Sequence, residues 1–180
     1  ERPTMAALLP GIVPQAQLTQ AVATSTSAMQ TALVIGPALG GLLYGFGAVL
    51  LIHATLRRHF REGTALGAAL LTWGATFLHW YMVQQPTTSH PASTFLAALV
   101  VWLWDRDRET RGPRGFLLLG LALGLAMCVR WQNGVLLVLP AIDLARHLRG
   151  TPLRDVLTRV ALLGAGAFLT AAPQLFVWKA

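Results

Sequence analysis

The segment that decides the fold reads Ala75-Thr-Phe-Leu-His-Trp-Tyr-Met-Val-Gln-Gln-Pro-Thr-Thr-Ser-His-Pro-Ala-Ser-Thr-Phe95. It joins two apolar segments through a polar loop that Pro86 and Pro91 bracket. Residues 79–81 precede the loop, and their His, Trp and Tyr rings are of the kind that favours a membrane–water boundary. Proline is also well tolerated at the start of a helix. The segment therefore predicts two helices joined by a turn at one face of a bilayer.

The composition excludes an ordinary soluble domain. Of the 180 residues, 54% are hydrophobic and 12% are charged, whereas soluble domains carry about 25% charged residues. The apolar residues fall in blocks long enough to span a bilayer, such as Thr64–Val83 and Val160–Val177. We therefore expect an all-α polytopic membrane protein with about six short or full-length membrane segments.

The net charge of +7 follows from basic clusters between the apolar blocks. Basic loops of this kind mark the cytoplasmic side of a membrane protein. We therefore expect the lipid bilayer as the partner of these clusters, and no nucleic acid. Eleven of the fourteen basic residues belong to three clusters: Arg57, Arg58 and Arg61; Arg106, Arg108, Arg111 and Arg114; and Arg146, Arg149, Arg154 and Arg159.

The first two crossings follow from the central loop. Helix Thr64–Val83 is expected to cross outward, and Pro91–Trp104 is expected to cross back. The mixed charges of Asp105–Arg114 then predict a solvated cytoplasmic loop.

The next apolar segments, Gly115–Val129 and Gly134–Ala145, are short for a bilayer core of about 30 Å. They are either one long span or two short segments joined by the polar tip Arg130–Asn133. Two segments keep both flanking basic clusters on one side, so we expect two. Asp143 is expected to pair with Arg146 on one helix face. Residues 148–159 predict an amphipathic surface segment, and Val160–Val177 the last span.

Small residues are dense near the N-terminus, in Gly36-Pro37-Ala-Leu-Gly40-Gly41. They predict either a helix-packing face or a hinge of a transporter helix, with a kink at Pro37. Together with Leu9-Pro10-Gly-Ile-Val13-Pro14, Leu18 and Ala21, this motif resembles the connection between the fourth and fifth helices of the major facilitator superfamily of transporters. The resemblance implies a transporter-like helix–loop–helix segment over residues 1–47, with Gly36, Pro37, Gly40 and Gly41 as its motif.

A second resemblance covers residues 48–180. The region resembles the polytopic GT-C glycosyltransferases, in particular bacterial members akin to the protein mannosyltransferases. That resemblance implies a multi-pass enzyme of the bacterial cytoplasmic membrane, which transfers a sugar from a polyprenyl-phosphate donor to an acceptor on the extracytoplasmic face. The motifs are Leu56-Arg57-Arg58-His59-Phe60, Trp73-x-x-Thr76-x-x-x-x-Tyr81, Pro86-Thr-Thr-Ser89-His90, Gly120-x-x-x-Gly124-Leu125-Ala126, Arg130-Trp131-Gln132-Asn133 and Pro173-Gln174-Leu-Phe-Val-Trp178-Lys179.

The two resemblances imply opposite orientations for the first basic cluster. Ala28–Leu56 is long enough for one span and too short for two, so Arg57–Arg61 would emerge outside if the transporter pattern held. We therefore expect the chain to be a fragment or a fusion, with a seam near Gly36–Leu50.

The candidate site residues are polar groups on the expected outer face. The GT-C resemblance implies a catalytic acidic residue on an extracytoplasmic loop, but none of the seven Asp and Glu residues falls in such a loop. General-base catalysis needs a carboxylate or histidine beside the acceptor hydroxyl, so no catalytic residue, metal site or cofactor is assigned. A divalent metal would belong to the full-length parent. The expected substrate-binding residues are Ser89, His90, Arg130, Gln132 and Asn133.

Each candidate has a structural alternative. Arg130 presents a donor fork suited to a phosphate, but it could equally anchor the chain at the interface. Ser89 and His90 could shape or cap the loop, and Gln132 and Asn133 could only form the turn. At the level of the whole chain, the alternatives are a fragment of a major facilitator transporter and a non-catalytic integral membrane protein.

Overall fold

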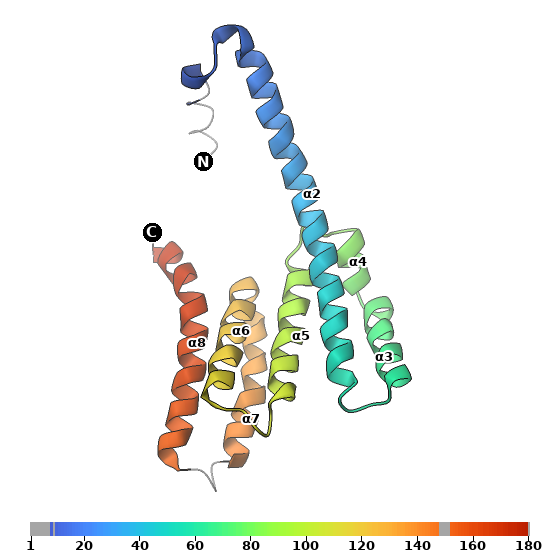
Figure 1. Cartoon of the computed structure of the whole chain (residues 1–180), viewed down its shortest axis with the longest axis vertical. Coiled ribbons are helices and arrows are strands. Elements are labelled where there is room, and N and C mark those ends of the chain that lie inside the picture. Colours follow the sequence, from blue (N-terminus) through green and yellow to red (C-terminus); the bar gives the residue numbers. More distant parts are fainter. Residues whose placement is uncertain (1–7, 9, 148–151, 180) are drawn as a thin grey trace. The chain divides into compact units, whose positions relative to one another are not determined.

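The computed structural model describes residues 8, 10–147 and 152–179, and these residues are almost wholly helical (Figure 1). Seven α-helices, α2 to α8, and one 3-10 helix, η1, make up the described elements from Gln15 onward. The chain divides into two compact units, Glu1–Leu39 and Gly40–Ala180, and the division falls inside α2. The predicted all-α fold class is confirmed, while the predicted boundary between residues 47 and 48 stays a prediction.

Helix α2 runs from Gln15 to Leu56 and continues through Pro37. It begins directly after Pro14, whose carbonyl accepts a 2.9 Å hydrogen bond from the amide of Gln17. The run Thr-Ser-Thr-Ser at residues 24–27 lies inside this helix. The polar residues there fit the helix because hydroxyls can bond to the carbonyl one turn earlier, as Thr31 does.

The predicted helix over residues 64–83 is two helices in the structure, so that prediction is wrong. Helix α3 spans Glu62–Ala75, and α4 spans Leu78–Val83. Thr76 interrupts them with an extended backbone (φ −114°, ψ 172°). Its hydroxyl then accepts a hydrogen bond from the amide of Leu78 at 3.3 Å and so satisfies an early donor of α4.

The small residues of α2 within the second unit form a packing face. An added Cβ at Gly41 would lie 2.6 Å from the Cβ of Pro86, and one at Gly47 would lie 2.9 Å from the ring of Phe95. Gly45 similarly faces Met82. The loop and the helix start that were predicted from residues 75–95 therefore rest directly on α2, which is possible because these glycines have no side chain.

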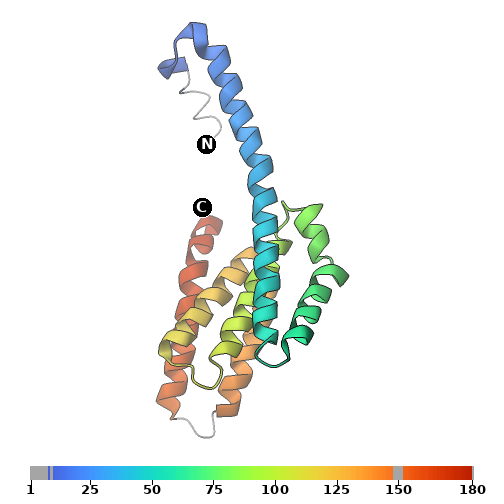
Figure 2. The same ribbon diagram turned by 45° about the vertical axis from the view of Figure 1, so that its right-hand side comes forward.

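The remaining helices are α5 (His90–Arg106), α6 (Pro113–Val129), η1 (Trp131–Leu137), α7 (Val138–His147) and α8 (Leu153–Lys179). Figures 1 and 2 both show that the chain reverses after α6, so that η1 and α7 run back alongside it. The prediction of two short segments in place of one long span is confirmed.

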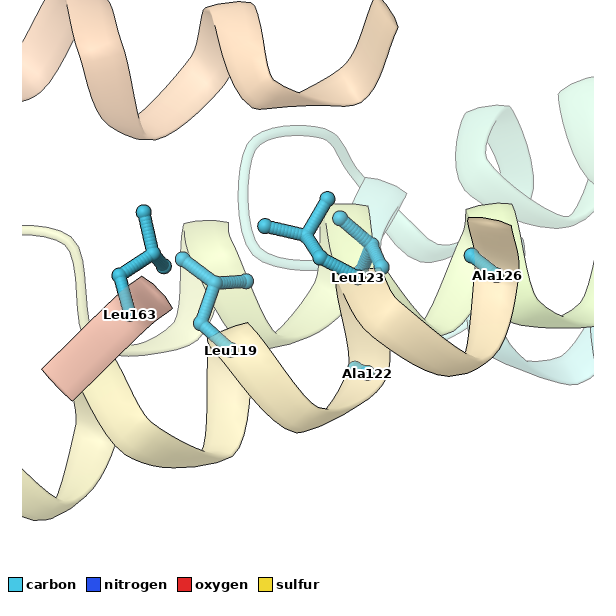
Figure 3. Close-up of a cluster of buried hydrophobic side chains, with 6 residues drawn as sticks. Leu119, Ala122, Leu123, Ala126 and Leu163 are labelled. Carbon is cyan, nitrogen blue, oxygen red and sulfur yellow. The ribbon is translucent and has the colours of Figure 1, made fainter. Parts of the chain in front are cut away.

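The core of the second unit is centred on α6 (Figure 3). Leu119 and Leu123 of α6 are fully buried, and Leu163 of α8 lies beside Leu119. The buried cluster consists of Val100, Leu119, Ala122, Leu123, Ala126 and Leu163, with Leu96, Leu99, Leu103, Trp104 and Leu136 packed around it.

Helices α6 and α8 make the closest helix contact, and it depends on glycine. An added Cβ at Gly120 would collide with the carbonyl of Leu163, and one at Gly124 would collide with Thr170 and Ala167. In return, an added Cβ at Gly166 of α8 would lie 2.5 Å from the carbonyl oxygen of Leu117. Small residues spaced four apart allow close backbone approach in membrane helices.

Two described helices are long and apolar enough to cross a membrane, namely α2 and the Leu153–Gln174 part of α8, and α6 is a shorter apolar helix. Large apolar side chains such as Leu43 (70% exposed) and Phe168 (62% exposed) lie on their surfaces, which fits apolar surroundings. Of the six membrane segments that were predicted, two are thus supported. The prediction of a separate surface segment over residues 148–159 is wrong from Leu153 onward, because α8 is continuous from that residue. Residues 148–151 lie outside the described residues.

The glycine contact yields the first prediction. Gly120→Ala should lower the free energy of unfolding by about 1–3 kcal/mol, because the methyl group forces the two backbones apart. The measurement is denaturation of the purified chain by increasing SDS in mixed micelles, followed by circular dichroism.

Gly164→Ala is the matched control, since an added Cβ at Gly164 meets no atom within 4 Å. It should be neutral or stabilising by up to about 1 kcal/mol, the difference in helix propensity. Equal losses in the two variants would contradict the close α6–α8 packing.

Candidate functional site

His90 is fixed at the first turn of α5. Ser89 is the N-cap residue, and its carbonyl accepts a 2.9 Å hydrogen bond from the amide of Ser93. Pro91 is fully buried in the first turn, where its locked φ suits a helix start. The His90 carbonyl in turn accepts a 2.9 Å bond from the hydroxyl of Thr94. The ring is therefore held at a helix N-terminus, where the backbone dipoles favour negative charge.

Arg130 reaches His90 because the chain leaves α6 at this residue. Helix α6 ends at Val129, and Arg130 has an extended backbone (φ −151°, ψ 119°). Its Nη1 lies 2.7 Å from Nδ1 and 3.5 Å from Nε2 of His90. A guanidinium only donates hydrogen bonds, so Nδ1 of His90 accepts, and the proton of the neutral ring is on Nε2.

Tyr81 of α4 stacks on His90, with 3.9 Å between ring centroids and 10° between ring planes. Burial, and then the charge of Arg130, lower the pKa of His90 below its ordinary value of 6.5. The imidazole is therefore neutral at pH 7 and serves as an acceptor for Arg130.

Asn133 fastens the turn that presents Arg130. Its Nδ2 donates to the carbonyl of Ala126 at 2.8 Å and to the hydroxyl of Ser93 at 3.0 Å. The Ser93 hydroxyl donates to Oδ1 of Asn133 at 3.3 Å, and Ser93 is buried on α5. Both amide protons of Asn133 are thus used within the protein, so the side chain joins η1 to α5 and to the end of α6.

The other two sequence-predicted residues are exposed at the same end. Ser89 makes no side-chain cap hydrogen bond, so the predicted alternative of hydroxyl capping is wrong for it. Gln132 is exposed in η1 next to Trp131, whose side chain is 77% exposed.

Sequence reasoning missed two residues of this cluster as site residues. Tyr81 was interpreted as an aromatic ring at the membrane–water boundary and as part of a family motif. Its position just before the loop that carries His90 could have identified it as a neighbour of the site. Ser93 lies three residues after His90, on the same helix face, and that spacing could have identified it.

The charged residues gather at the opposite end of the second unit. Arg58 of the first basic cluster and the neighbouring His59 lie 3.1 Å and 2.8 Å from the carboxylate of Asp105, near the end of α5. Arg108 lies 3.1 Å from Asp143, near the third cluster. The described members of the three clusters thus share one end of the helical unit, as the charge pattern predicted, while Arg149 lies outside the described residues.

The predicted loop over residues 105–114 is shorter and less solvated than expected, because α5 extends to Arg106 and α6 begins at Pro113. The side chains of Asp105 and Arg111 are 9% and 3% exposed. Asp143 accepts a 2.6 Å hydrogen bond from the indole of Trp104, besides its pair with Arg108. Asp143 therefore has tertiary partners, whereas its predicted pair with Arg146 stays a prediction.

All carboxylates in the described part of the chain lie at this charged end. Four are in ion pairs with basic side chains, and two, Glu109 and Asp155, line clefts beside arginines. The paired ones are Glu62, Asp105, Asp107 and Asp143. Among the described residues, no three His, Cys, Asp or Glu side chains are grouped to hold a metal ion. The sequence-predicted donor-binding residues are therefore separated from every described carboxylate.

The transporter-like motif lies inside α2. Gly41 packs against Pro86, whereas an added Cβ at Gly36 or Gly40 would meet open space. The packing interpretation thus holds for Gly41, and Pro37 lies within the continuous helix.

One family model matches the chain, over residues 26–178, and its description is dolichyl-phosphate-mannose-protein mannosyltransferase. The match includes both the His90–Arg130 cluster and the Gly36–Gly41 motif. No curated protein and no solved structure matches the chain. The comparisons give no support to the transporter resemblance.

The Asn133 contacts yield the second prediction. Asn133→Ala should lower the free energy of unfolding by about 1–3 kcal/mol, because the buried Ser93 hydroxyl loses its partner. The measurement is the same SDS titration.

Gln132→Ala serves as the neighbouring control, since that side chain is exposed. It should change stability by less than about 0.5 kcal/mol. If Asn133→Ala also changed the free energy of unfolding by less than this amount, the turn would not depend on this amide.

Proposed function

Because the chain belongs to the dolichyl-phosphate-mannose-protein mannosyltransferase family, we propose that it binds a polyprenyl-phosphate-linked sugar through Arg130 and His90. The family implies a donor of this class. In the proposed reaction, the sugar passes to an acceptor on the extracytoplasmic face of a bacterial cytoplasmic membrane. This chain contributes the donor-binding part.

The observation that supports the proposal is the contact between Arg130 and His90. Within the described residues, the side-chain hydrogen bonds of Arg130 go only to the His90 ring. Its guanidinium has five N–H donors, so donors remain for the oxygens of a phosphate. Bidentate binding of a phosphate by a planar guanidinium is both strong and directional.

The surroundings of the pair favour an anion. His90 and the exposed hydroxyl of Ser89 lie at the N-terminus of α5, a 17-residue helix. A helix N-terminus combines free N–H groups with positive partial charge, which suits phosphate. The described carboxylates all lie at the other end, so none of them repels a phosphate here.

The five expected binding residues receive different roles in this proposal. Arg130 and His90 contact the phosphate, and Ser89 and Gln132 are the exposed polar groups beside it. Asn133 positions Arg130, because its amide protons are already donated to Ser93 and Ala126. Trp131 remains at the lipid boundary, as expected of an exposed indole.

Donor binding to the purified chain tests the role of Arg130. Arg130→Ala should weaken the binding of dolichyl-phosphate mannose by about 10- to 100-fold, since hydrogen bonds to charged groups contribute about 1.5–3 kcal/mol. Arg130→Lys should recover part of the affinity, because the point charge remains while the fork is lost. Binding is measured by equilibrium dialysis in detergent with radiolabelled donor.

Arg57→Ala is the control, since Arg57 is exposed and forms its 2.8 Å pair with Glu62 at the charged end. It should leave donor affinity unchanged. Unchanged affinity in Arg130→Ala would exclude the proposed phosphate site.

The lowered pKa of His90 gives a pH prediction. A bound phosphate stabilises the protonated imidazole, so binding raises the pKa of His90 and takes up protons. Donor affinity should therefore increase as the pH falls toward and through 6.5, the ordinary value. The measurement is the donor Kd across this range.

His90→Asn should flatten the pH dependence while it keeps a polar side chain at the helix start. A wild-type profile that weakens on acidification would show that His90 does not share the phosphate. Without donor, the sign is opposite for folding: the lowered pKa means that stability falls as the pH drops below 6.5.

A further inference from the structure

Two guanidiniums at the charged end face the same aromatic ring. The Cζ of Arg111 lies 5.4 Å, and that of Arg159 lies 5.6 Å, from the ring centroid of Phe116. Arg111 precedes α6, whereas Arg159 belongs to α8. Both arginines line two adjacent clefts of about 100 Å³ and 280 Å³. Each cleft is thus lined by two positive charges that come from residues far apart in the sequence.

Arg111 is buried with incomplete compensation of its charge. Its side chain is 3% exposed, and its stem lies on Gly115, where an added Cβ would be 2.6 Å from Cγ. Nη2 donates to the carbonyl of Trp104, and Nη1 is 3.9 Å from Asp143. Nε has no hydrogen-bond partner among the described residues. Burial is the main cause that lowers the pKa of Arg111, ahead of the opposing effect of Asp143.

Two of the nearby acids are already engaged by other side chains, while Glu109 and Asp155 line the clefts themselves. Asp143 accepts from Arg108 and Trp104 at 3.1 Å and 2.6 Å. Asp107 is bound by both Nε and Nη2 of Arg106. Arg159 forms no ion pair with a carboxylate in the described ranges, although Asp155 lies one turn before it. Since a guanidinium stays charged even when buried, the larger cleft keeps a net positive charge, with Arg111 and Arg159 against the one carboxylate of Asp155.

The start of α6 adds to this positive potential. Gly112 is its N-cap, with an extended backbone and no side-chain cap, and Pro113 follows. Both line the larger cleft together with Arg111 and Arg159. The N-terminal dipole of this 17-residue helix favours an anion at the same place.

The apolar surroundings indicate a lipid rather than a soluble anion. Leu162 lines the larger cleft. On the first turns of α8, Leu153, Leu157 and Val160 are 70%, 59% and 48% exposed. A phosphate group between Arg111 and Arg159 would thus be attached to acyl chains that cover these side chains.

We propose that the cleft bounded by Arg111, Arg159 and the start of α6 binds the phosphate of an anionic phospholipid. The lipid lies in the cytoplasmic leaflet, because the basic clusters mark that side. Basic pockets between membrane helices on the cytoplasmic side are suited to anionic headgroups. This site is at the opposite end of the unit from His90 and Arg130, and it does not depend on the proposed donor binding.

Native mass spectrometry of the full chain in neutral detergent tests the site, with phosphatidylglycerol as probe and phosphatidylcholine as the neutral comparison. Wild type should retain one phosphatidylglycerol in preference to phosphatidylcholine. Arg159→Gln should weaken phosphatidylglycerol binding about fivefold, the effect of one basic residue near a lipid surface. It should not change phosphatidylcholine binding.

Arg57→Gln and Arg130→Ala are charge-matched controls at other places, and both should retain the lipid. As a second measurement, phosphatidylglycerol should raise the unfolding midpoint of wild type more than that of Arg159→Gln. Equal loss in Arg57→Gln and Arg159→Gln would overturn the proposal. Displacement of the lipid by excess inorganic phosphate would also overturn it, in favour of a small-anion site.

Discussion

The contact between the backbones of α6 and α8 supports both ends of the second unit. Gly120, Gly124 and Gly166 allow this contact, since any side chain there would meet backbone atoms of the other helix. In a bilayer, burial of apolar surface does not drive helices together, and close packing must do so. Because α6 (Pro113–Val129) joins Arg111 to Arg130, the helix that these glycines hold against α8 connects the charged end to the polar end.

The charge and length rules predicted the main features of the fold. The three basic clusters required two short segments after residue 114, and that requirement also brought Arg130 to the same face as His90. Local interruptions were not predictable in the same way. The break at Thr76 depends on one hydroxyl that bonds to the amide of Leu78, and apolar composition alone does not distinguish this from a continuous helix.

The sequence placed the candidate residues at one end of the unit but did not predict their contacts, and their role in donor binding stays a prediction. The charge rule placed His90 and Arg130 on one face, yet the stack of Tyr81 and the Ser93–Asn133 pair depend on how α4, α5 and η1 meet. The charged loop shows the same limit. Its sequence suggested solvent, whereas Asp105 and Arg111 are buried because partners arrive from helices that are distant in sequence.

The choice of a neutral partner for Arg130 has a consequence for turnover. In the proposed transferase, the spent carrier phosphate must leave after each sugar transfer. A carboxylate partner would compete with every incoming phosphate and would have to be separated from Arg130 each time. His90 instead offers an uncharged acceptor to which the guanidinium can return at little cost. In the proposed transferase, the resting contact would therefore make both loading and release of the carrier a near-balanced exchange of hydrogen bonds.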